Sequence, residues 1–204
     1  MKRLCVIIIT VVILMSHCLC AEAFAANVLT HTVVKGDSLW KIAVKYQVGL
    51  SEIIGANPQF SNPDLIYPGQ KVYIPILDST ITSYEQQVID LVNNIRVQNG
   101  LGKLTANWEL SRIARYKSQD MHDNRYFSHT SPVYGTPFDM IKNFGISFRT
   151  AGENIAQGYA TPEAVVNGWM NSSGHRANIL NASYTQIGVG YVSNGNYWTQ
   201  MFIG

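Results

Sequence analysis

Three polar residues in the second half of the chain have side chains suited to acid–base chemistry or metal binding. His129, Glu153 and His175 each stand among turn-forming and large apolar residues, a setting in which a loop exposes an ionisable group at a cleft. Two imidazoles and one carboxylate could bind zinc and leave a fourth position for water, as in hydrolytic zinc sites. Without metal, a His oriented by Glu could act as a general base. A third interpretation is a hydrogen-bonded polar cluster without turnover, since spacings of 24 and 22 residues match no metal-ligand motif.

Other chemistries are disfavoured by what the sequence lacks. It has no Gly-x-Ser-x-Gly elbow and no phosphate-binding glycine loop, and its three cysteines all fall within the first 20 residues. Fifteen Lys and Arg residues face thirteen Asp and Glu residues, so the formal net charge is only +2. Proteins that bind nucleic-acid phosphates usually carry a basic stripe, and none is visible. The sequence therefore predicts no nucleic-acid partner.

The first 25 residues are typical of a secretory signal. Lys2 and Arg3 precede an apolar run at 4–19, and Ala23-Phe24-Ala25 fits the small-x-small rule for cleavage. The run is shorter than the roughly 20 residues that a spanning helix needs. We therefore expect cleavage after Ala25, secretion, and no stable membrane anchor afterwards. A mature chain without cysteine favours a bacterial source.

Residues 27–78 predict a small unit of strand, helix, helix and strand. An extended segment at 32–34 leads into the turn Gly36-Asp37-Ser38, whose Asp or Ser can cap a helix. Apolar residues at helical intervals give this helix one buried face: Leu39, Ile42, Ala43 and Tyr46. A second short helix, with Ser51 as its candidate N-cap, and a final strand at 71–74 complete the unit.

This unit resembles the LysM module, a small βααβ carbohydrate-binding domain, along essentially its whole length. The resemblance rests on HTVVKGDSLWKIA at 31–43, IIGANP at 53–58 and IYPGQKVYIP at 66–75. It implies binding of N-acetylglucosamine glycans, peptidoglycan or chitin, in a shallow groove between two loops. The implied groove residues are Gly36, Asp37, Ser38, Leu39, Leu65, Ile66, Tyr67, Pro68 and Gly69. Backbone groups and small apolar side chains suit a neutral polymer.

Residues 79–204 predict helices followed by a terminal antiparallel sheet, an α+β layered domain. The expected elements are helices at 83–99, 108–121, 137–144 and 161–170, and hairpin strands at 185–192 and 197–203 around an Asn194-Gly195 turn. Capping residues indicate the helix starts: Ser83 with Gln86 as a capping box, Asn107, and Thr161 before Pro162.

The second unit resembles the bacterial branch of the CAP superfamily, which includes cysteine-rich secretory proteins, antigen 5 and pathogenesis-related proteins. The resemblance runs from about Ser83 to the C-terminus. It rests on FSHTSP at 127–132, GENI at 152–155, SGHRANIL at 173–180, ASYTQIGVGY at 182–191 and YWTQ at 197–200. It implies an α-β-α sandwich.

Many eukaryotic members of this family line a central cleft with two His and two Glu that can hold a divalent cation. His129 matches the first His, and Glu153 matches the first Glu. At the usual places of the second Glu and the second His, this chain has Ser172 and Ser183. His175 is positioned to offer a replacement imidazole. The expectation of a divalent cation such as zinc therefore rests on the resemblance alone, and the sequence requires no cofactor.

Together these features predict a secreted, cell wall-associated bacterial protein. Its LysM module would bind peptidoglycan or a chitin-like glycan, and its CAP domain would present the His and Glu cleft. Two alternatives remain open. One is a wall or peptide hydrolase, with or without metal, acting through His129, Glu153 and His175. The other is a carrier of a lipid or small apolar ligand. Because Gram-positive spore formers often pair these modules, the spore is one expected setting.

Overall fold

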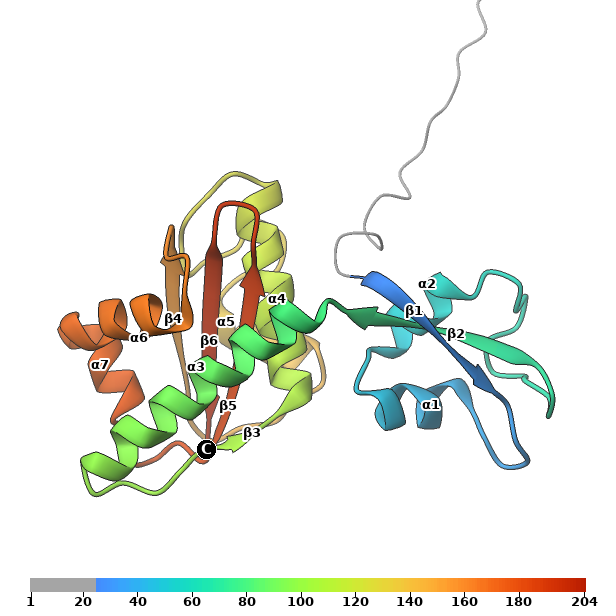
Figure 1. Cartoon of the computed structure of the whole chain (residues 1–204), viewed down its shortest axis with the longest axis horizontal. Helices are drawn as coiled ribbons and strands as arrows, with labels where there is room; N and C mark the ends of the chain where they lie inside the picture. Colours follow the sequence, from blue (N-terminus) through green and yellow to red (C-terminus); the bar gives the residue numbers. More distant parts are fainter. Residues whose placement is uncertain (1–24) are drawn as a thin grey trace, which may run out of the picture.

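The computed structural model describes residues 25–204, which form two units joined end to end (Figure 1). The predicted signal sequence lies outside the described residues, apart from Ala25. Within residues 25–204, no helix combines the length and the apolar character that a membrane crossing requires.

The first unit is the expected βααβ module. Its elements are β1 (Ala25–Thr32), α1 (Leu39–Tyr46), α2 (Leu50–Ala56) and β2 (Lys71–Leu77), and the two strands pair antiparallel. Ser38 caps α1 as predicted, because its Oγ accepts a hydrogen bond from the Lys41 amide at 3.2 Å. Two expectations are wrong. The first strand ends at Thr32 and does not run over 32–34, and Gly49, not Ser51, holds the N-cap position of α2. The module has its own core, centred on Leu39, Ile42, Ala43, Ile53, Val72 and Ile74.

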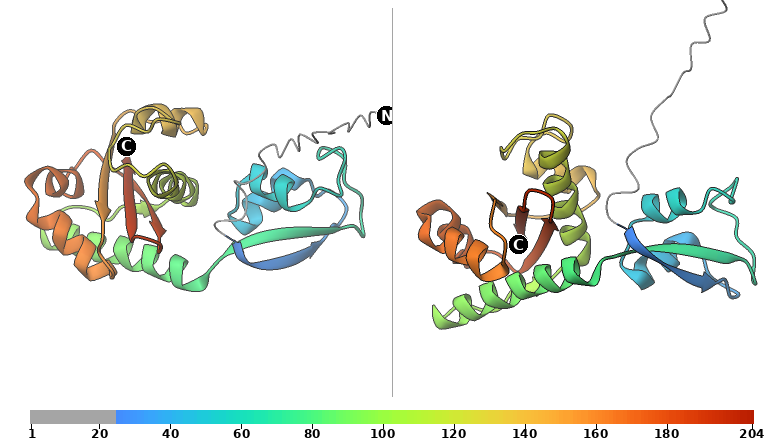
Figure 2. Two further views of the ribbon diagram at one scale, coloured as in Figure 1. Left: turned by 90° about the horizontal axis from the view of Figure 1, so that it is seen from above. Right: turned by 45° about the horizontal axis from the view of Figure 1, so that its top comes forward.

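The second unit is an α-β-α sandwich. Its elements are α3 (Ser79–Gln98), β3 (Thr105–Ala106), α4 (Trp108–Asp123), α5 (Pro137–Asn143), β4 (Ala151–Gln157), α6 (Pro162–Asn171), α7 (Ser173–Ile179), β5 (Gln186–Val192) and β6 (Tyr197–Ile203). The strands lie in the order β3-β5-β6-β4. Helices α3, α6 and α7 cover one face of this sheet, while α4 and α5 cover the other (Figure 2). The α+β class and the sandwich are thus as the sequence predicted.

Several local expectations differ from the structure. The capping box at Ser83 is wrong, because α3 begins four residues earlier, where Asp78 accepts a hydrogen bond from the Thr80 amide at 2.7 Å. The terminal hairpin is confirmed, but its left-handed residues are Gly195 and Asn196. The sheet also contains a strand on each side of the hairpin: β4 is antiparallel to β6, and the short β3 is parallel to β5.

Helix α4 approaches β5 unusually closely, and two glycines make this possible. Successive strand residues face opposite sides of a sheet, so Gly188 and Gly190 face α4 while their neighbours face α3. A Cβ on Gly190 would lie 2.1 Å from the amide nitrogen of Arg115. The Ser118 hydroxyl donates to the Gly190 carbonyl at 3.0 Å. The glycines therefore set the position of α4, the helix that precedes the candidate site.

Candidate functional site

A cleft of about 370 Å³ lies beside strand β4 of the sandwich. It is formed where the segment after α4, the start of α5, the start of β4 and α7 come together. The lining residues are His129, Thr130, Thr136, Pro137, Phe138, Ala151, Gly152, Glu153 and Asn178. Two of the three residues singled out from the sequence, His129 and Glu153, therefore share one cleft.

His129 and Glu153 form a close pair. The imidazole Nδ1 of His129 lies 2.7 Å from Oε1 of Glu153. The Glu153 residue is only 6% exposed, whereas the His129 side chain is 54% exposed. Burial raises the pKa of Glu153, and the hydrogen bond from His129 and the charge of Lys117 oppose part of this rise. The pair thus presents an exposed imidazole that a buried carboxyl group orients, which is the arrangement of a general base.

A buried lysine that the sequence analysis missed holds the segment that carries His129. Lys117 of α4 is 1% exposed, and its Nζ donates to the Tyr126 hydroxyl and to the carbonyls of Ser128 and His129 at 2.8–3.0 Å. The carboxylate of Asp120, one turn along α4, accepts hydrogen bonds from two hydroxyl groups of the same segment, those of Tyr126 and Ser131. The hydrogen bonds of Lys117 and Asp120 therefore hold the segment at 126–131, which includes His129, against α4.

The third residue, His175, makes no hydrogen bond to the pair, although burial and, after it, the charge of His129 lower the pKa of His175. It lies on α7, and its main-chain carbonyl accepts a hydrogen bond from Asn154. Among residues 25–204, the His175 imidazole makes no hydrogen bond to His129 or Glu153, and no group of three or more His, Cys, Asp or Glu side chains is placed to hold a metal ion. The residues present therefore do not fit the three-ligand zinc site that was considered. Glu153 lies on a strand and His175 on a helix, whereas the sequence analysis expected both on loops.

Behind Glu153 lies a buried amide network that also escaped sequence analysis. Asn178 donates to the Glu153 carbonyl at 3.1 Å and to the Asn154 side chain at 2.9 Å. Asn154 in turn donates to the side chain of Gln200 at 2.9 Å. These amides connect α7, β4 and β6. They hold β4 in register beneath the cleft, and their only signal in the sequence was that they fall within the family motifs.

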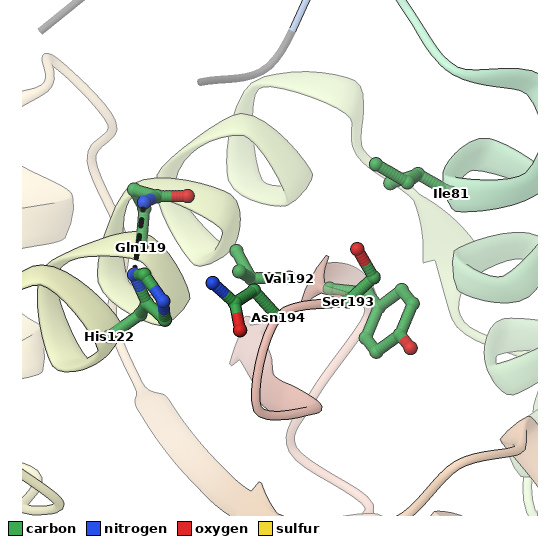
Figure 3. Close-up of a pocket in the computed structure, with 7 residues that line it drawn as sticks. Ile81, Gln119, His122, Val192, Ser193 and Asn194 are labelled. Carbon is green, nitrogen blue, oxygen red and sulfur yellow. Dashed lines mark hydrogen bonds between the residues drawn. The ribbon is translucent and has the colours of Figure 1, made fainter.

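A second hollow, of about 220 Å³, lies at the tip of the hairpin (Figure 3). Gln119 and His122 of α4 face Val192 and Asn194 across it. The His122 Nδ1 lies 2.7 Å from Asp123, at the end of the helix. None of the residues singled out as a candidate site lines this hollow.

The two LysM loops lie next to each other at one end of the module. The Val33 amide donates to the Gln70 carbonyl, and the Gly69 amide donates to the Val33 carbonyl, both at 2.9 Å. Gly36 and Gly69 have φ of 95° and 90°, in the left-handed region that glycine favours. These contacts join the strand end just before 36–39 to the end of 65–69, so both loops lie at the same end of the module.

The nine residues implied for the groove do not have equal access to a ligand. Leu39 is 3% exposed and belongs to the core, and Ile66 packs against the same core. Gly36, Leu65, Tyr67, Pro68 and Gly69 are exposed. The exposed residues of this region also include two apolar side chains that the sequence analysis passed over, Val34 and Trp40.

Asp37 organises the first loop. Its Oδ2 accepts hydrogen bonds from the Val34 amide and lies 2.9 Å from Nε2 of His31, a buried residue whose Nδ1 contacts the Tyr46 hydroxyl. The contact with His31, followed by the Val34 hydrogen bond, lowers the pKa of Asp37 below its usual value of 3.8. Because the pKa of Asp37 is lower in the folded state than in the unfolded state, its carboxylate stabilises the fold at pH values above 3.8. This stabilisation is lost as the pH falls through the folded-state pKa.

We therefore expect Asp37→Asn to lower the melting temperature of residues 27–78 at pH 7, and the difference from wild type to close as the pH falls below 3.8 and through the lower folded-state pKa. Asp64→Asn, which changes an exposed carboxylate of the same module, serves as the control and should leave the melting temperature unchanged. Thermal unfolding followed by circular dichroism at pH 2–7 measures both. A difference that persists unchanged at pH 2 would show that the charge of Asp37 is not the cause.

The fold and the cleft together define a two-domain protein, a βααβ module followed by an α-β-α sandwich with a His–Glu pair. Comparison with known families assigns both parts. The chain belongs to the cysteine-rich secretory protein family, CAP, whose model matches residues 89–202, and it carries a LysM domain at residues 31–75. Both resemblances seen in the sequence are confirmed.

Individual relatives match one part of the chain or the other. The uncharacterised protein YkwD of Bacillus subtilis is 59% identical over 126 residues, which cover 62% of this chain and 49% of YkwD. The spore coat assembly protein ExsA of Bacillus cereus is 56% identical over 45 residues, 22% of this chain and 7% of ExsA. A solved extracellular protein with an SCP domain from Bacillus anthracis is 39% identical with a TM-score of 0.59, over 67% of this chain and 47% of that one. The chain thus spans about half or less of these relatives.

Proposed function

We propose that this is an exported cell-wall protein that binds N-acetylglucosamine glycan, in peptidoglycan, through its LysM loops and holds its CAP cleft at the wall. The observation that supports the proposal is that the loops at 36–39 and 65–69 lie at the same end of a family-assigned LysM domain, where Val33 bonds to Gly69 and Gln70. The similarity to a spore coat assembly protein supports the spore envelope as a setting.

The charges of the module favour a neutral ligand. Within 27–78, four basic residues balance four acidic ones: Lys35, Lys41, Lys45 and Lys71 against Asp37, Glu52, Asp64 and Asp78. The exposed loop residues are glycines and apolar side chains, with Tyr67 55% exposed. Such a surface offers backbone hydrogen bonds and apolar contacts to a sugar N-acetyl group, and no strong field to an anion.

We expect residues 27–78 to sediment with purified peptidoglycan, and residues 79–204 to remain in solution. The halves can be tested separately because their hydrophobic cores share no residue. Because the module is neutral, raising the salt from about 0.05 to 0.5 M should change the bound fraction less than about twofold. Equal sedimentation of both halves, or a steep loss in salt, would refute the proposal.

A wall or peptide hydrolase is the second candidate, and the His129–Glu153 pair favours it specifically. An exposed imidazole oriented by a buried carboxyl group can remove a proton from an attacking hydroxyl group or water. The same peptidoglycan suspension tests this function. Soluble fragments released by the wild type and not by His129→Ala would establish it, whereas equal release or none would leave the binding protein alone.

A further inference from the structure

The two domains touch through a charged contact between α2 and α4. Nε and Nη2 of Arg112 donate to the two carboxylate oxygens of Glu52 at 2.5 and 2.8 Å. The Tyr116 hydroxyl donates to the same carboxylate at 2.9 Å, and the Ser51 hydroxyl donates to it at 2.7 Å. One LysM carboxylate thus accepts four hydrogen bonds, three of which come from the CAP domain.

This contact differs from an ordinary surface ion pair in how it is held. The Glu52 and Arg112 side chains are 26% and 21% exposed, so water screens them only in part. The Arg112 guanidinium lies 5.3 Å from the ring centres of both Tyr116 and Phe144. Two aromatic rings of the CAP domain therefore orient the guanidinium before Glu52 meets it, which reduces the entropy lost on pairing.

Gly49 lies directly against the contact and leaves space for it. Its backbone, with φ of −71° and ψ of 150°, suits any residue, so conformation does not require glycine there. A side chain there would displace the pair, because a Cβ on Gly49 would lie 2.0 Å from Oε2 of Glu52 and 2.2 Å from Nε of Arg112. The missing side chain on the LysM module therefore makes room for a guanidinium from the other domain.

The covalent connection between the domains is short. Strand β2 ends at Leu77 and α3 begins at Ser79, so Asp78 is the only residue between them. Rotation about this one residue could still swing the CAP domain as a whole. A second contact between the domains prevents this rotation. The contact of Glu52 on α2 with Arg112 on α4 is such a contact.

We propose that the Glu52–Arg112 contact is a clasp that fixes the CAP domain relative to the LysM module, so that both move as one rigid body. Any surface that the LysM module binds then determines the direction in which the CAP cleft faces. The clasp does not depend on the ligand of either domain, and the proposed function does not depend on the clasp.

The absence of cysteine from residues 26–204 allows a direct test on the whole mature chain. Exposed Lys35 and Lys103, one on each domain, are changed to Cys and spin-labelled, and pulsed dipolar spectroscopy measures the distribution of the distance between the labels. We expect one narrow distribution for the otherwise unchanged chain. Glu52→Gln and Gly49→Ala should each at least double its width, because one removes the charge and the other displaces the pair.

Two further variants complete the test. Glu109→Gln neutralises an exposed carboxylate on the same α4 and should leave the width unchanged. Arg112→Gln added to Glu52→Gln should broaden the distribution no further, because the clasp is already open. A broad distribution in the unchanged chain, a narrow one in Glu52→Gln, broadening by Glu109→Gln, or an additive effect of Arg112→Gln would each overturn the proposal.

Discussion

Replacing Gly190 by Ala is expected to lower the free energy of unfolding of the CAP domain by about 3 kcal/mol, the upper part of the range for overpacked cores. The added Cβ would lie 2.1 Å from the Arg115 amide nitrogen and 2.2 Å from the Ala114 carbonyl carbon. Both atoms belong to the α4 backbone, which cannot turn aside as a flexible side chain can. Chemical denaturation of residues 79–204 measures the loss.

Gly174→Ala is the matched control for this prediction. Gly174 lies in α7, and nothing stands within 4 Å of where its Cβ would be. Because alanine is the better helix former, this change should leave stability equal or raise it by up to about 1 kcal/mol. If Gly190→Ala were as stable as Gly174→Ala, α4 would not approach β5 as closely as the structure shows.

Replacing Lys117 by Met is expected to cost about 2–4 kcal/mol and to loosen the segment at 126–136, because charged hydrogen bonds contribute roughly 1.5–3 kcal/mol each and the relief of a buried charge offsets part of the loss. Methionine keeps the apolar length of the side chain but donates nothing to Tyr126, Ser128 or His129. Denaturation gives the loss of stability, and amide hydrogen exchange gives its location, since exchange should rise most in 126–136.

Lys103→Met removes an exposed lysine of the same domain and should change neither stability nor exchange.

A second consequence of Lys117→Met concerns the cleft. The charge of Lys117 lowers the pKa of Glu153, so its removal should raise that pKa further. Unchanged exchange at 126–136 would mean that the segment is ordered without Lys117, and that its contribution to positioning His129 is negligible.

The LysM module was predictable almost in full because its information is local. The turn at Gly36 to Ser38, the apolar spacing of α1 and the final strand are each set by residues close together in the chain. Two predictions in it are wrong: the first strand spans Ala25–Thr32 and not 32–34, and Ser51 does not cap α2. The second has a tertiary cause. The Ser51 hydroxyl instead donates to Glu52 and accepts a hydrogen bond from Arg112 of the other domain.

In the CAP domain, the sequence predicted where helices begin better than it predicted which strands pair. Helices with capping residues, such as α4 after Asn107 and α6 after Thr161, begin where expected. Strand β4 was missed because it lies between covering layers and its buried residues show no alternation of apolar and polar side chains. Its assignment needed the hairpin strand β6 with which it pairs.

The sequence by itself determined the two families, the α+β class and the match of His129 and Glu153 to family positions. Only the tertiary structure decided which polar residues meet, because hydrogen bonding between side chains depends on distances that chain spacing does not encode. His175 makes no hydrogen bond to the pair although the charge of His129 reaches it, while Lys117, a single lysine on an otherwise ordinary helix, is buried beneath the cleft. The contact of Glu52 with Arg112, sixty residues away, likewise exists only because the fold brings α2 and α4 together.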